Sequence, residues 1–83
     1  MTFTTTRESA YPDYVIYSVS VGALEVGAVE KIGGRFYATA EDGSEPADGF
    51  DTLELASAAV EEMTRKMAEE DADYRESLNA EAS

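Results

Sequence analysis

The pair Gly33-Gly34 limits the fold of this chain more than any other feature, because it separates two stretches that read as β-strands. A two-residue hairpin loop needs positive φ angles, which glycine adopts at little cost. Residues 24–32 (LEVGAVEKI) and 35–41 (RFYATAE) are therefore predicted to form an antiparallel hairpin.

The loop also predicts the register of this hairpin, since each residue before it faces one after it. Counting outward pairs Ile32 with Arg35, Lys31 with Phe36, Glu30 with Tyr37 and Val29 with Ala38. In this register Val29, Phe36, Ala38 and Ala40 share one face, which we expect to be the core side.

A third strand is predicted over residues 14–21, YVIYSVSV, which alternate strictly between two faces. Val15, Tyr17, Val19 and Val21 form the face expected to meet the helix. Tyr14, Ile16, Ser18 and Ser20 form the opposite face. That second face is either covered by residues 2–7 or a second copy of the chain, or it is a docking surface with tyrosine anchors.

A helix is predicted to begin after Phe50, where Asp51 would cap it, Glu54 would complete a capping box and Phe50 would pack on Leu55. Apolar residues follow at a three-four spacing, which draws one stripe that we expect to lie on the sheet. They are Leu53, Ala56, Val60, Met63 and Met67. The buried part of this helix is predicted to end near Ala68.

These elements predict an α+β fold, a three-stranded antiparallel β-meander packed by one C-terminal amphipathic helix. Residues 1–12 would be a flexible N-terminal segment or an edge strand, 13–68 the domain, and 69–83 a helix extension or a disordered acidic tail. Because the chain has 83 residues, we expect a single domain with a small core.

Negative charge is concentrated in the second half of the chain. The net charge is −12, with four acids and three bases in residues 1–40 and fourteen acids and three bases in residues 41–83. Such a charge disfavours direct binding to nucleic acid or to an anionic membrane. Glu69, Glu70, Asp71 and Asp73 crowd the expected helix end, where the macrodipole disfavours acids, so we attribute them to solubility or to a cationic partner.

The motifs VEKIGGRFYA (29–38), DG (42–43) and GFDTLELASAAV (49–60) resemble the sheet-plus-helix arm-site-binding domains of phage integrases. The resemblance covers residues 26–60 and implies a similar fold. In that family the stretch between the positions of Tyr37 and Phe50 is basic and reads DNA. Here the same stretch carries Glu41, Asp42, Glu45 and Asp48 and no base, so the resemblance does not imply DNA binding.

Catalysis and cofactor binding have no recognisable basis in the sequence. The chain contains neither cysteine nor histidine, which removes thiolate and imidazole nucleophiles, bases and metal ligands. The loop acids Asp42, Glu45, Asp48 and Asp51 lack calcium-loop spacing. We therefore expect no enzyme activity, no metal and no cofactor. With no apolar run long enough to span a membrane and no signal peptide, we expect a cytoplasmic protein, in the host cytoplasm if it is phage-encoded.

The charge distribution favours a non-enzymatic acidic inhibitor that mimics nucleic acid and blocks the basic groove of a nucleic-acid-handling protein. Phage anti-CRISPR proteins are similar in size and acidity, so a CRISPR effector is one such partner. The alternatives are a halophile-adapted accessory domain and an assembly module that dimerises through its sheet. For the inhibitor, the expected contact residues are Glu41, Asp42, Glu45, Asp48, Glu61, Glu62, Glu69 and Glu70.

Overall fold

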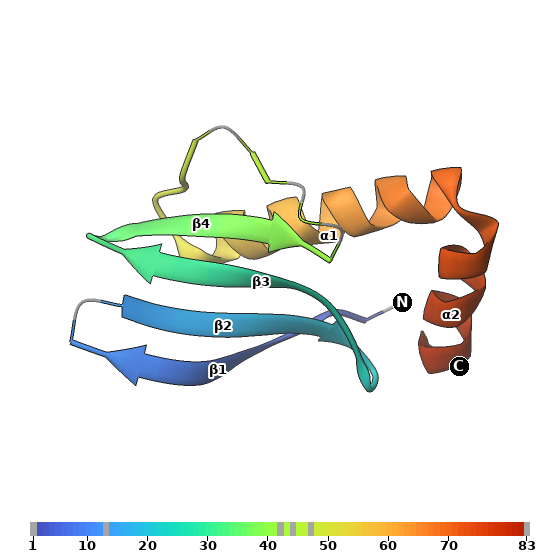
Figure 1. Cartoon of the computed structure of the whole chain (residues 1–83), viewed down its shortest axis with the longest axis horizontal. Helices are drawn as coiled ribbons and strands as arrows, with labels where there is room; N and C mark the ends of the chain where they lie inside the picture. Colours follow the sequence, from blue (N-terminus) through green and yellow to red (C-terminus); the bar gives the residue numbers. More distant parts are fainter. Residues whose placement is uncertain (1, 13, 42, 44, 47, 83) are drawn as a thin grey trace.

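Four antiparallel strands and two helices make up the chain in a computed structural model, which describes residues 2–12, 14–41, 43, 45–46 and 48–82 (Figure 1). The strands follow one another in the sheet in sequence order, β1-β2-β3-β4. The elements are β1 (Thr4–Tyr11), β2 (Tyr14–Val21), β3 (Leu24–Ile32), β4 (Arg35–Ala40), α1 (Leu53–Glu70) and α2 (Ala72–Ala82).

The predicted fold of three strands and one helix is therefore wrong, although the α+β class holds. The fourth strand, β1, which the three-stranded prediction leaves out, pairs with β2 from Thr4 opposite Ser20 to Tyr11 opposite Tyr14. Its sequence, TTTRESAY, has no apolar alternation, so the periodicity that reveals β2 is absent. Residues 4–11 thus lie beside β2 in the plane of the sheet and do not cover its face.

The predicted β3–β4 hairpin is confirmed in its loop and its register. Gly33 and Gly34 have φ angles of 59° and 80°. The predicted pairs from Ile32–Arg35 to Val29–Ala38 all occur. The two positive φ angles match the loop geometry whose twist suits antiparallel strands.

The core lies between one face of the sheet and α1. Val19, Val26 and Val29 from the sheet are buried, together with Ala56 and Val60 from the helix. The helix approaches β3 closely at Gly27, where an added Cβ would lie 2.7 Å from Val60 Cγ1 and 2.5 Å from the Thr39 carbonyl oxygen. Glycine at position 27 thus allows the helix to reach this depth.

The start of α1 differs by one residue from the prediction. Thr52, and not Asp51, is the N-cap, since its Oγ1 accepts a hydrogen bond from the Leu55 amide at 3.2 Å. Leu55 itself is 52% exposed. Phe50 extends the sheet, because its amide and carbonyl exchange hydrogen bonds of 2.7 and 2.9 Å with Phe36.

A second helix follows α1 after a single residue, Asp71. The Asp71 amide donates to the Met67 carbonyl and ends α1, while Asp71 Oδ1 accepts from the amides of Asp73 and Tyr74 and begins α2. Acids at a helix N-terminus are stabilising. The expectation that Asp71 and Asp73 do nothing for helix stability is therefore wrong, since both lie at the start of a second helix.

α2 lies across the end of the sheet at the β2–β3 turn (Figure 1). Leu78 is only 1% exposed and belongs to the core cluster, and Tyr74 packs against the same cluster. The turn residue Gly22 has a φ of 58°, and a Cβ added there would lie 2.8 Å from the Glu81 carbonyl oxygen. The turn and α2 are thus packed against each other.

We predict that Leu78→Ala destabilises the protein by about 2–4 kcal/mol, because a buried leucine leaves a cavity when it is truncated. The control is Leu55→Ala, the same change on an exposed helical position, with an expected loss below about 1 kcal/mol. Urea unfolding monitored by circular dichroism measures both. Equal losses for the two variants would show that α2 is not docked.

We also predict that Gly22→Ala costs more than Gly33→Ala. Both glycines have nearly the same positive φ, and both variants therefore incur about 1–2 kcal/mol of left-handed strain. Only position 22 has a neighbouring atom within 4 Å of the new Cβ, so only that variant adds about 1–3 kcal/mol of overpacking. Thermal or urea unfolding gives the difference, which would vanish if α2 did not contact the turn.

Candidate interaction surface

The sheet face opposite α1 is uncovered in the part of the chain that the structure describes. In Figure 1 α1 lies behind β4, and α2 lies at one end of the strands. The register places two cross-strand rows on this open face: Tyr14, Ile32 and Arg35, then Ile16, Glu30 and Tyr37. Ile32 and Tyr37 are 45% and 42% exposed. Large apolar side chains therefore remain in contact with solvent here.

The four β2 residues predicted as a docking surface are more enclosed than Ile32 and Tyr37. Tyr14, Ile16 and Ser20 are half-buried, and Ser18 is buried. Ser18 Oγ donates a 2.7 Å hydrogen bond to Glu8 Oε1 of the neighbouring strand. Because β1 borders these residues on one side, the most accessible part of the face lies over β3 and β4.

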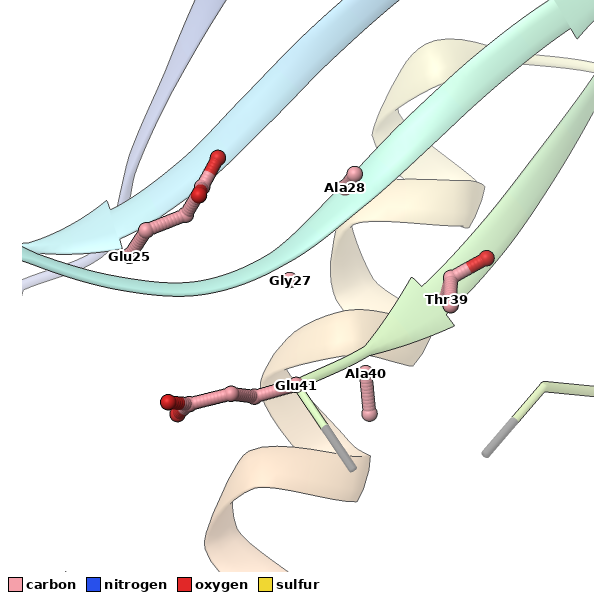
Figure 2. A pocket seen from close by; sticks show the side chains of 6 residues that line it. All are labelled: Glu25, Gly27, Ala28, Thr39, Ala40 and Glu41. Carbon is pink, nitrogen blue, oxygen red and sulfur yellow. The ribbon is translucent and has the colours of Figure 1, made fainter. Parts of the chain in front are cut away.

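Four described carboxylates border or lie on this open face. Glu8 reaches it through its bond to Ser18, and Glu30 lies in the row with Ile16 and Tyr37. Glu25 and Glu41 flank a shallow hollow of about 230 Å³ whose floor is made by small residues, including Gly27 and Ala28 (Figure 2). The Glu41 amide also donates to the Val26 carbonyl at 3.1 Å, which fixes the end of β4 beside β3.

Positive charge on the open face is limited to Arg35 among the described residues. Its Nη1 forms an ion pair with the Asp51 carboxylate, and its Nη2 donates to the Gly49 carbonyl at 2.6 Å. The register places Arg7 and Lys31 on the other side of the sheet, opposite Tyr17 and Phe36. The carboxylates of the open face therefore have no unpaired basic neighbour on it.

The predicted loop acids lie along the segment that joins β4 to α1. Glu45 and Asp48 are exposed, whereas Asp42 falls outside the described residues. Between them, Pro46 borders an apolar groove of about 360 Å³ against α1. The groove is lined by Pro46, Phe50, Leu55, Ala58, Ala59, Glu62, Met63 and Lys66. The loop and Glu62 thus border one groove, which also contains a base.

The four predicted helix acids do not form one face. Glu61 is half-buried and lies 3.5 Å from Arg65, whose guanidinium stacks 5.3 Å from the centre of the Phe3 ring. Glu62 and Glu69 line a shallow hollow that also contains Arg65 and Lys66. Successive residues are about 100° apart around a helix, so Glu61 and Glu62 point in different directions. Glu70 is the exposed last residue of α1.

Among residues 2–12, 14–41, 43, 45–46 and 48–82, no three acidic side chains gather in an arrangement that could hold a metal ion. No described helix combines the length and apolar character required to cross a bilayer. The open sheet face presents charged side chains together with exposed aromatic and aliphatic side chains.

Sequence reasoning missed Glu25, Glu30, Ile32 and Tyr37 as candidate contact residues. The signal was available, because the predicted hairpin register already pairs Glu30 with Tyr37 and places both opposite the core face. The density of acids along the chain favours the loop and α1 instead. Density does not show which acids are neutralised by bases on neighbouring strands or helix turns.

Comparison with known proteins identifies no relative of this chain. Its sequence matches no protein-family model and no curated protein, and its structure matches no solved structure. The resemblance to integrase arm-site-binding domains stays a prediction. Any functional argument therefore depends on the surface itself.

Proposed function

We propose that this protein is a non-enzymatic acidic binding module that docks its open sheet face on a basic surface of a nucleic-acid-handling protein in the cytoplasm. The observation that carries the proposal is the composition of that face. It combines four carboxylates, two exposed apolar side chains and one arginine that is already paired. Apolar and aromatic anchors surrounded by one sign of charge are typical of protein interfaces with steered association.

The charge of the module selects the class of partner. Nucleic acid and anionic lipid carry the same sign as this face and would be repelled. A groove that binds phosphates carries lysine and arginine, so an acidic sheet could occupy it in place of the phosphates. An inhibitor of this kind, similar in size and acidity to phage anti-CRISPR proteins, is the specific form of the proposal.

Glu41 connects the open face to the acidic loop, since it follows β4 directly and flanks the hollow in Figure 2. Glu45 and Asp48 continue the negative charge along the exposed loop. We therefore assign the leading contacts to Glu25, Glu30 and Glu41, supported by the loop. Glu61 and Glu70 are not part of this assignment. Glu61 is paired with Arg65, and Glu70 is the last residue of α1.

We predict that Glu25→Lys/Glu30→Lys weakens partner binding at least tenfold without changing the circular dichroism spectrum, because it replaces attraction by repulsion at the centre of the interface. The partner is first captured from host lysate with and without nuclease, then purified. Affinity is measured by calorimetry at two salt concentrations and in competition with an oligonucleotide.

The matched control is Glu76→Lys/Glu81→Lys, which makes the same charge change at exposed positions of α2. This control should keep most of the affinity. Equal losses for the two double variants would mean that net charge alone matters and would contradict the assignment to the sheet face. A partner that the oligonucleotide does not displace would contradict the nucleic-acid mimic.

Salt dependence of stability separates this proposal from halophilic adaptation. We predict a modest gain in the free energy of unfolding that levels off below roughly 0.5 M KCl, because screening of the −12 charge is nearly complete when the Debye length falls to a few ångströms. Urea unfolding across a KCl series measures it. A protein that unfolds at low salt and gains stability steeply into the molar range would instead be a halophile-adapted domain.

A further inference from the structure

Asp71 alone separates α1 from α2, although its backbone keeps the hydrogen bonds of a helix. Its amide donates to the Met67 carbonyl at 2.8 Å, and its carbonyl accepts from the Arg75 amide at 3.0 Å. Both bonds join residues four apart, as in an uninterrupted α-helix. The chain turns here because Asp71 is extended, with a φ of −127° and a ψ of 106°. Helical angles at this one residue would therefore join residues 53–82 into a single helix.

The hydrogen bonds made by the Asp71 side chain can be exchanged for those of a continuous helix. Its Oδ1 accepts from the amides of Asp73 and Tyr74 at 3.0 and 3.2 Å. In a continuous helix these amides would instead donate to the carbonyls of Glu69 and Glu70, four residues back. Because one set of bonds replaces the other, hydrogen bonding favours neither the bent nor the straight form strongly.

Contacts with the sheet hold α2 in the bent position. Leu78 is 1% exposed, Tyr74 packs on the same core cluster, and the Glu81 backbone lies beside the turn at Gly22. α2 has 11 residues, so a straight helix would extend about 16 Å beyond Asp71 and carry these contacts away from its own sheet. The same contacts would form on a second copy of the chain, because its sheet ends in an identical surface.

We propose that two copies of this chain exchange their α2 helices, each straightening at Asp71 and docking Tyr74 and Leu78 on the sheet of the other copy. The exchange is reciprocal about a two-fold axis close to Asp71, so it closes as a dimer. Ala68 lies in the core cluster, and in a straight helix Ala72 would follow it on the same side. These two small residues leave room for the helices to cross. The inference does not depend on the proposed function, since α2 lies at the end of the strands and not over the open face (Figure 1).

Repulsion between carboxylates opposes this exchange at low salt. The crossing places Glu70, Asp71 and Asp73 of one copy beside the same residues of the other. Like charges repel within a Debye length, so the association constant should rise as KCl shortens that length. The exchange requires only that α2 opens, because the sheet and α1 of each copy keep their shared core.

Sedimentation of the full chain from about 1 µM to about 1 mM, in about 0.5 M KCl, tests the proposal. The wild type should reach twice the 9.0 kDa monomer mass as concentration rises. Asp71→Ala should raise the association constant at least tenfold, because alanine removes the cap of α2 and favours a continuous helix. The matched control is Asp71→Asn, which removes the same charge but keeps a capping side chain. It should change association by less than about threefold.

Nuclear magnetic resonance on mixed isotopically labelled and unlabelled wild type, at about 1 mM in the same salt, distinguishes exchange from side-by-side association and needs no variant. Nuclear Overhauser effects should join Leu78 of one copy to buried valines in the sheet of the other. A dimer without these contacts overturns the proposal, as does a wild type that stays monomeric at the highest concentration. Equal effects of Asp71→Ala and Asp71→Asn would overturn it too, since the bend at Asp71 would then not control association.

Discussion

The contact between Val60 and the backbone at Gly27 determines the arrangement of everything else. No side chain separates helix and strand at this point, since even a methyl group on residue 27 would lie 2.7 Å from Val60 Cγ1. The helix therefore covers β3 and β4 on one face of the sheet. Valines and alanines from both layers fill the interface, with Leu53 and Met63 of α1 packed against them. In the part of the chain that the structure describes, the other face receives no helix, and this asymmetry leaves aromatic and acidic side chains accessible on one side of a thin two-layer protein.

The distribution of charge over the surface follows from the same arrangement of helix and sheet. The acids of α1 share their helix with Arg65 and Lys66, so charges of both signs lie within a few ångströms of one another. Among the described residues the open face has no comparable compensation, because its one arginine, Arg35, is bound to Asp51 and to the Gly49 carbonyl. Fewer acids without basic neighbours can produce a more negative surface than many acids that alternate with bases.

Local chemistry decided which parts of the fold could be predicted from the sequence. The β3–β4 hairpin was predictable because two glycines determine a loop and the loop determines a register. The buried stripe of α1 was predictable in its first half, since Ala56 and Val60 are buried, but beyond them Thr64 and Ala68 are buried while Met63 and Met67 are half-buried. β1 could be predicted only as one of two alternatives, an edge strand or a flexible segment, because its threonines gain a strand conformation only from the edge that β2 provides. α2 was obscured by its many acids, although Tyr74 and Leu78, four residues apart, are the pair that packs on the core.

α2 is attached to the rest of the fold by few contacts, among them those of Asp71 and Leu78. Two side chains, Tyr74 and Leu78, the contact with the Gly22 turn and one shared capping residue hold this helix to a core that is otherwise complete between the sheet and α1. Local opening of α2 therefore breaks far fewer contacts than global unfolding. Its free energy of opening lies at the low end of the range for partly open states. The C-terminal helix would exchange, fray and refold many times during the lifetime of one folded sheet.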